Sequence, residues 1–123
     1  MSLTDQIEDT VFHDADLVRC STEGDTLTLQ FRNIALEWGQ EEYYSAVVVL
    51  SGVREIRRFD KPVGQLLSEG EGADVLQFRR GEGTALLLVE WIYYRQPVNV
   101  FAKYEIDYAT LSITVEKQDG LIV

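Results

Sequence analysis

Residues 26–31 read Thr26-Leu27-Thr28-Leu29-Gln30-Phe31, in which polar and apolar side chains alternate strictly. In an extended chain, successive side chains point to opposite faces, so this alternation is typical of a strand with one buried and one solvated face. Glu23-Gly24-Asp25 precedes the stretch and has the composition of a tight turn. The sequence therefore predicts a turn followed by a β-strand, and much of the remaining chain repeats this pattern.

The phase of the alternation changes at defined places. Apolar residues move from odd to even positions at Arg32-Asn33, and from even to odd positions near Asp107-Tyr108-Ala109. A strand that keeps one face buried changes phase only at a bulge or a bend. Ser51-Gly52 interrupts the long run from Tyr43 to Phe59 in the same way. Because residues 98–117 are too long for one straight strand, we expect a hairpin there, with its turn at the phase change.

Other segments complete the prediction of the fold. The apolar runs 46–50 and 85–89 are far shorter than the ~20 residues of a membrane helix, so they indicate buried strands. The glycine-containing segment 80–84 is the best hairpin signal. Residues 4–10, where Thr4 is an acceptable helix cap, and residues 61–67 each favour a helical turn. We predict one domain over residues 1–123 that is all-β, or β-rich with a short N-terminal helical turn. The expected architecture is an antiparallel sandwich or a strongly coiled sheet of about six to seven strands.

The chain is strongly acidic. Its 123 residues include 21 Asp and Glu against 11 Lys and Arg, which gives a net charge of -10. Such a field repels nucleic acid and anionic membranes, so we expect neither as a partner and regard a basic protein as the electrostatic complement. The single cysteine, Cys20, permits no internal disulfide, and residues 1–9 lack the basic and apolar regions of a signal peptide. These features predict a cytoplasmic protein.

The only histidine, His13, lies in the segment Phe12-His13-Asp14-Ala15-Asp16. Imidazole, carboxylate and the Cys20 thiol are all metal ligands, but a zinc site uses three or four ligands and the chain has no paired His or Cys spacing. A hydrolytic triad would have to use this one histidine as well. We therefore predict no metal, no cofactor and no catalytic residue. Phe12, His13 and Asp14 are interpreted as a structural turn before the first strand.

Charged residues offer further chemical alternatives. Glu37 and Glu90 each precede a tryptophan, and the two carboxylates could meet across neighbouring strands as a catalytic acid–base pair. Among 21 acidic residues, however, such pairs are expected by chance, and solvent-facing strand positions are the simpler explanation. Segment 69–74 is rich in acids and glycine but lacks the ligand order of a calcium loop. The arginines and the lysine of segment 54–61 could bind a phosphate group, because the arginine side chain forms paired hydrogen bonds with phosphate oxygens. The acidic field instead favours salt bridges between them and neighbouring carboxylates.

Aromatic side chains are the best candidates for binding. Consecutive pairs such as Tyr43-Tyr44 and Tyr93-Tyr94 point to opposite faces of a strand, so one member of each pair is exposed if only one face is buried. Tyrosine and tryptophan are enriched at interface hot spots. If both faces are covered, the same residues are structural instead. The predicted binding residues are Trp38, Tyr43, Tyr44, Trp91, Tyr93, Tyr94 and Tyr104.

Two segments near the start of the chain carry a resemblance. Phe12-His13-Asp14-Ala15-Asp16-Leu17, followed by Gly24-Asp25-Thr26-Leu27-Thr28-Leu29, resembles a loose group of small bacterial proteins that open with an F-H-D-[AS]-x-[LI] segment before a β-rich body. The resemblance covers about the first quarter of the chain. Some members of the group look like immunity proteins of bacterial toxin systems, and many have no assigned function. The resemblance implies kinship and no catalytic residue.

These observations lead to one main functional hypothesis and two alternatives. The main hypothesis is a non-enzymatic, cytoplasmic bacterial protein that binds another protein, in its most concrete form an immunity-type partner of a basic toxin. The first alternative is a small ligand-binding or hydrolytic β-barrel, with an interior pocket of tyrosines and carboxylates. The second is a homo-oligomeric structural protein whose aromatic strand face is the subunit interface.

Overall fold

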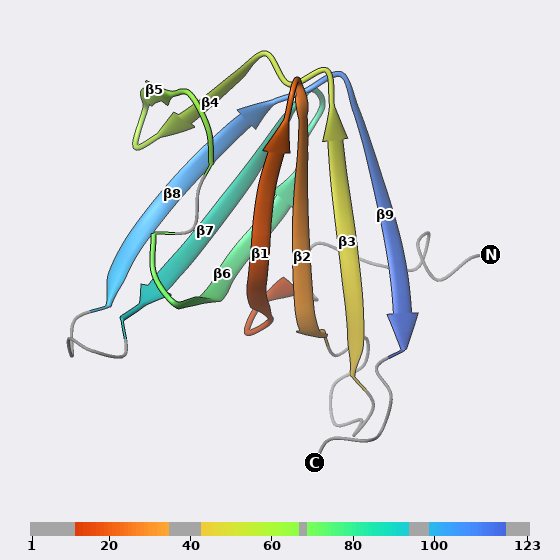
Figure 1. Cartoon of the computed structure of the whole chain (residues 1–123), viewed down its shortest axis with the longest axis vertical. Coiled ribbons are helices and arrows are strands. Elements are labelled where there is room, and N and C mark those ends of the chain that lie inside the picture. Colours follow the sequence, from red (N-terminus) through yellow and green to blue (C-terminus); the bar gives the residue numbers. More distant parts are fainter. Residues whose placement is uncertain (1–11, 35–42, 67–68, 94–98, 118–123) are drawn as a thin grey trace.

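The structure is a computed structural model that describes residues 12–34, 43–66, 69–93 and 99–117. These residues form an antiparallel sheet of nine strands in the order β5-β4-β8-β7-β6-β1-β2-β3-β9 (Figure 1). The strands are β1 (Asp16–Glu23), β2 (Thr26–Ile34), β3 (Tyr44–Ser51), β4 (Glu55–Arg58), β5 (Lys61–Val63), β6 (Gly72–Arg80), β7 (Thr84–Ile92), β8 (Val100–Asp107) and β9 (Thr110–Lys117). The prediction of an all-β, antiparallel fold is confirmed. The described residues contain no helix of the length and hydropathy needed to cross a membrane.

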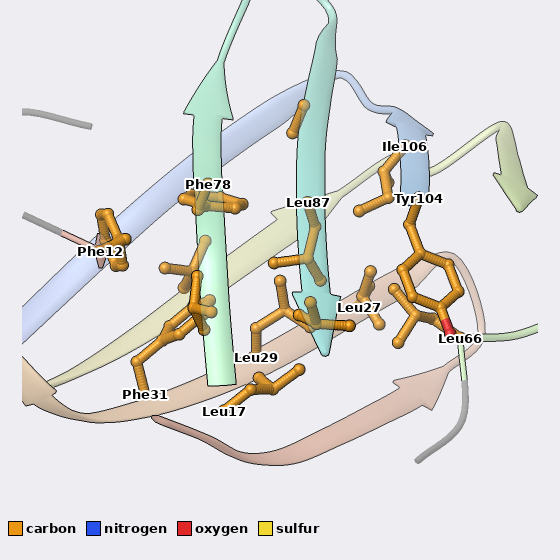
Figure 2. Packing of buried hydrophobic residues seen from close by; sticks show 14 of the residues in the cluster. Phe12, Leu17, Leu27, Leu29, Phe31, Leu66, Phe78, Leu87, Tyr104 and Ile106 are labelled. Carbon is orange, nitrogen blue, oxygen red and sulfur yellow. The ribbon is translucent and has the colours of Figure 1, made fainter. Parts of the chain in front are cut away.

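The sheet is folded into two layers that enclose one core. Strands β1, β2, β3 and β9 lie side by side in one layer, and β6, β7 and β8 lie in the other (Figure 1). The layers join where β1 meets β6, through the single register pair Asp16↔Asp74. Inward-pointing residues of both layers interdigitate, and Figure 2 shows Leu29 and Phe31 close to Phe78 and Leu87.

A bend in two paired segments connects the layers on the side opposite this seam. β3 leads into β4 and β8 leads into β9, and β3 pairs with β9 while β4 pairs with β8. At the bend, the Ala109 N–H donates to the Ser51 carbonyl at 3.0 Å. Gly52 has a φ of 66°, and a Cβ at this position would lie 2.6 Å from the Cβ of Ala109. Both the backbone conformation and the available space therefore require glycine here.

The predicted turns and phase changes at three positions are confirmed. The pairing of β2 with β3 shifts register after Phe31, where Asn33 has a φ of 62°. Gly24 joins β1 to β2, and Gly83 joins β6 to β7, with φ angles of 61° and 76°. The change of phase predicted the irregular pairing at Asn33, and the glycine-containing composition predicted the two turns.

The predicted hairpin over residues 98–117 is wrong. β8 and β9 do not pair with each other, since β8 lies between β7 and β4 while β9 pairs with β3. The phase change near Tyr108 marks the bend between the layers, where the chain continues forward. The same bend divides residues 43–59 into separate strands, so the described chain has nine strands instead of six to seven.

The two predicted helical turns have different outcomes. Lys61–Val63 forms the edge strand β5, which pairs with β4, so the helical turn predicted for residues 61–67 is wrong at its start. Pro62 is accommodated because an edge strand has a side on which no N–H donor is needed. The helical turn predicted for residues 4–10 lies outside the described residues.

Three phenylalanines anchor one end of the core. Phe12 is fully buried, and its ring packs edge-on against Phe31 and Phe78, with centroid distances of 5.0 Å in both cases. Phe12 precedes β1, whereas the other two belong to opposite layers. Phe12 thus fixes the start of β1 against both layers at the seam.

An ion-pair cluster lies beside the bend on the outer side of β4 and β8. Arg57 donates hydrogen bonds to Asp107 at 2.7 and 3.1 Å and to Glu55 at 2.8 Å. The Thr84 hydroxyl also donates to Asp107, at 2.8 Å. The hydrogen bonds from Arg57 and then Thr84 lower the pKa of Asp107 from its usual 3.8 to about 2. The cluster therefore links β4, β7 and β8 through charged side chains.

Gly52→Ala should lower the free energy of unfolding by about 2–4 kcal/mol, because left-handed backbone strain adds to the overlap with Ala109. Gly24→Ala is the matched control: Gly24 has a similar φ of 61°, but a Cβ there would meet nothing within 4 Å. The control should lose about 1–2 kcal/mol, from backbone strain alone. Urea denaturation measures both losses, and equal losses would contradict the steric role of Ala109.

Acid should weaken the cluster around Asp107. Because the pKa of Asp107 is lower in the folded chain, its ionisation stabilises the fold above pH of about 4, and this contribution is lost as the pH falls towards about 2. Asp107→Asn should therefore cost on the order of 1–2 kcal/mol at neutral pH, and almost nothing near pH 2. Urea denaturation across this pH range tests the effect. A loss that is independent of pH would show that the carboxylate charge is not responsible.

Candidate functional site

The segment that contains His13 forms a turn that attaches the start of β1 to β6. Asp14 has a φ of 68°, and its N–H donates to the Val75 carbonyl at 2.9 Å. The exposed His13 donates a hydrogen bond from Nδ1 to the Leu76 carbonyl at 2.8 Å. Cys20 lies on the inner side of β1, opposite buried Leu29. No group of His, Cys, Asp and Glu within the described ranges has the geometry to hold a metal ion. These contacts support a structural role for the segment.

The predicted aromatic binding residues are divided between core and surface. Trp91 and Tyr104 are 1% and 2% exposed, and Trp91 Nε1–H donates to the Tyr104 hydroxyl at 3.0 Å. A partner that docks on the folded domain cannot contact either of them. Tyr44 and Tyr93 are half-buried against the core, and Tyr43 is exposed. Two further predicted residues lie outside the described chain: Trp38 and Tyr94.

Tyr104 connects the core to a surface ion pair. Its hydroxyl donates to the carboxylate of Glu69, which also accepts two hydrogen bonds from Arg58, at 2.9 and 2.8 Å. Arg58 is the last residue of β4 and lies directly opposite Tyr104 in the sheet. The chain of hydrogen bonds from Trp91 to Arg58 therefore fixes the position of the turn that follows β4.

The sheet register aligns carboxylates and aromatic rings across the outer face of the molecule. Asp16 of β1 pairs with Asp74 of β6, which in turn pairs with Glu90 of β7. Glu90 pairs with Phe101 of β8, and the Phe101 ring centroid is 5.9 Å from that of Phe59. Directly paired residues point to the same side of a sheet, and the neighbours of these residues point inward. We call Asp16, Asp74, Glu90, Phe101 and Phe59 the acidic–aromatic row.

The carboxylates of the row repel one another. Burial, and then the negative charges of Asp16 and Glu90, raise the pKa of Asp74 above its usual 3.8. Asn33 donates a hydrogen bond to Asp16, and Asn99 donates one to Glu90 at 2.8 Å. Like charges at directly opposite positions destabilise a sheet. The row therefore holds an unfavourable interaction that a cation from a partner would relieve.

An open groove of about 300 Å³ runs beside the acidic end of the row. Its lining includes the carboxylates of Asp16, Glu71 and Asp74 and the apolar side chains of Val18 and Ile92. Lysine and arginine combine an aliphatic stem with a charged head, so their side chains match this mixture of apolar surface and carboxylates.

A strained turn displays the aromatic end of the row. Arg58 pairs with Lys61 across the β4–β5 hairpin, which leaves Phe59 and Asp60 as a two-residue turn with φ angles of 49° and 68°. Turns of this kind favour Asn-Gly, and a bulky residue at positive φ is a rare exception. Phe59 and Phe101 are nevertheless 41% and 47% exposed, and the Arg58 guanidinium lies 5.2 Å from the centre of the Phe59 ring. Backbone strain is typical of functional sites, because packing alone would select against it.

Two of the clustered basic residues are paired with carboxylates. Arg57 is bonded to Asp107, and Arg58 is bonded to Glu69, so the predicted salt bridges are present at both positions. The proposed partner of Glu90 in an acid–base pair, Glu37, lies outside the described residues.

Sequence patterns did not identify the acidic–aromatic row as one surface. Asp16 and Glu90 were noted separately, and the pairing of β1 with β6 joins segments that are distant in the chain. Two local signals were present. Phe59-Asp60 occupies a turn where Asn-Gly is usual, and Phe101 is an apolar residue at an odd position in a strand whose buried residues are even.

Comparisons of the chain with protein-family models, with curated proteins and with solved structures found no match. The function proposed below therefore rests on the residues and their geometry.

Proposed function

We propose that this protein is a non-enzymatic protein-binding module that docks a basic partner on the acidic–aromatic row. The observation that carries the proposal is the row itself. Three carboxylates oppose one another across neighbouring strands and lead directly to two exposed phenylalanines. This arrangement costs stability in the free protein, and a basic, partly apolar surface complements it.

Charge and aromatic contacts have different roles in the proposed binding. The net charge of -10 accelerates the encounter with a basic protein. Phe59 and Phe101 then supply large apolar contacts that slow dissociation. A lysine or arginine placed beside Asp74 removes part of the repulsion that raises the pKa of this carboxyl.

The most concrete form of the proposal is an immunity-type role against a basic toxin. The resemblance at residues 12–17 and the acidic charge support this form. Mixing the protein with basic toxin domains encoded in its genomic neighbourhood should abolish the toxicity of one of them. Unchanged toxicity across all of these domains would exclude the immunity-type role.

The placement of the polar groups supports a binding module over an enzyme or ligand-binding barrel. Apolar side chains of both layers occupy the space between the described strands (Figure 2). The inward-facing polar tips of Trp91 and Tyr104 bond to each other. His13 and Glu90, either of which would favour the barrel if it lay in a polar interior pocket, lie on the outside, and the Glu69 carboxylate that Tyr104 contacts is paired with Arg58.

Asp74→Asn should weaken binding and stabilise the free protein. The loss of charge should lower affinity about 3–10-fold, because a carboxylate near the partner's cation is removed. The pKa of Asp74 is raised in the folded state, so its ionisation destabilises the fold above this pKa. Because Asp74 is exposed and water screens the repulsion, the variant should gain only a few tenths of a kcal/mol, roughly 0.2–0.5, at neutral pH, and less in acid. Calorimetry with a toxin domain and urea denaturation measure the two effects.

Glu82→Gln is the control for Asp74→Asn, because it removes the same charge from the β6–β7 turn, outside the row. We expect a smaller loss of affinity and no gain in stability. If both variants weaken binding equally, only the overall charge of the protein matters and the row is not the binding site.

Phe101→Ala and Phe59→Asn should each lower affinity at least about tenfold, because each removes an exposed aromatic contact. Phe59→Asn should not lower the free energy of unfolding, since asparagine tolerates the positive φ of the turn. Tyr43→Ala is the control: this ring is 42% exposed but lies outside the row. Surface plasmon resonance should show faster dissociation for the two phenylalanine variants alone. A larger effect of Tyr43→Ala would move the binding surface away from the row.

A further inference from the structure

The outer side of β2, β3 and β9 carries two cross-strand rows of uncharged side chains. These residues alternate along each strand with buried ones, so they point away from the core. Charged residues make up 26% of the chain, which makes an uncharged block at neighbouring outward positions unusual for this protein. We call this block the uncharged face; its rows are Thr28, Val49 and Ser112, and Gln30, Val47 and Thr114.

The corresponding part of the other layer is different. There, Leu86 of β7 is flanked on neighbouring strands by Arg79 and Glu105, and Lys103 lies close by. Long charged side chains shield aliphatic surface from water. Val47 and Val49 have no such flanking charges, because their direct partners on both sides are Ser, Thr or Gln.

Opposite charges lie on the two flanks of the uncharged face. Arg19 of β1 pairs with Gln30 and extends that row by one strand, and Glu116 of β9 lies two residues along the strand from Thr114. Both side chains are on exposed residues. A two-fold axis parallel to the strands would turn one copy of the face onto another and place β1 of each copy over β9 of the other. Arg19 of each copy would then lie beside Glu116 of the other.

We infer that the uncharged face is the interface of a symmetric homodimer in which two copies pack sheet against sheet. Each copy carries a net charge of -10, so two copies repel each other unless they meet where no carboxylates are brought together. The uncharged face meets this condition, and its flanks are complementary under a two-fold axis. Sheets packed in this way keep their strands within about 30° of each other.

The size of the face indicates a weak dimer. Three strands and two outward rows span about 15 Å by about 15 Å. Stable interfaces bury about 800 Å² on each partner, so the surrounding residues must contribute and the affinity should be modest. This interface shares no residue with the acidic–aromatic row, so dimerisation does not depend on the proposed function.

Sedimentation equilibrium of the full chain over a range of concentrations tests the dimer. The wild type should show a monomer–dimer equilibrium, and Val49→Lys should raise the dissociation constant at least about tenfold, because it buries a charge at the centre. Leu86→Lys is the matched control, since it introduces the same charge at a half-buried position on the other layer. A wild type that stays monomeric at all concentrations, or equal effects of both variants, would overturn the inference.

A charge exchange tests the two-fold arrangement without altering the centre. Arg19→Glu and Glu116→Arg should each weaken the dimer, and the double variant should recover the wild-type dissociation constant to within about threefold. Failure of the double variant to recover would contradict the arrangement. Moderate salt should strengthen the dimer by screening the repulsion between the two acidic chains, whereas it should weaken binding of a basic toxin domain.

Discussion

The bend shared by the β3–β4 and β8–β9 segments is the constraint on which the rest of the structure depends. Because β3 pairs with β9 and β4 pairs with β8, the two segments must turn together. Gly52 permits the turn by bringing its backbone against Ala109, where no other residue type fits. Once the segments have turned, β4 and β8 belong to the second layer, and β6 is brought back to β1. The core between the layers can then close around Phe12 and its neighbours.

This closure explains why the acidic–aromatic row lies at the seam. β1 and β6 meet at one residue pair, and the next neighbours in register are contributed by β7 and β8. Two aspartates at directly opposite positions repel each other and therefore destabilise the pairing of β1 with β6. Instead, Phe12 and the backbone hydrogen bonds of Asp14 and Val75 hold β1 against β6. The outward side chains at the seam are therefore not needed to join the two strands.

The fold class followed from the sequence because alternation reports directly on which side of a strand is buried. Residues 26–31 are predicted as a strand on this basis, and the turns near Gly24 and Gly83 are predicted from their glycine-containing composition. The hairpin predicted over residues 98–117 was wrong because a phase change occurs both at a hairpin turn and at a bend in a continuing chain. Only the pairing of β9 with β3 and of β8 with β4 shows that this one is a bend. The surface proposed for binding could not be predicted for the same reason, because its residues come from strands that are distant in the sequence. Residue type alone favours tyrosine and tryptophan as binding residues, yet Tyr104 is buried, whereas Phe101 lies on the outer side of β8 opposite Glu90 and is exposed.

The β4–β5 hairpin has a consequence for how molecules of this protein associate in a crowded cell. β5 ends one side of the sheet, and it contains three residues, of which Pro62 has no N–H to offer an incoming strand. Exposed Lys61 adds a charge that would be buried by further strand pairing. This edge is therefore poorly suited to the edge-to-edge addition of strands that leads to fibrils. A chain rich in β-structure is thereby protected on this side from uncontrolled polymerisation, and contacts with other molecules are directed to the faces of the sheet.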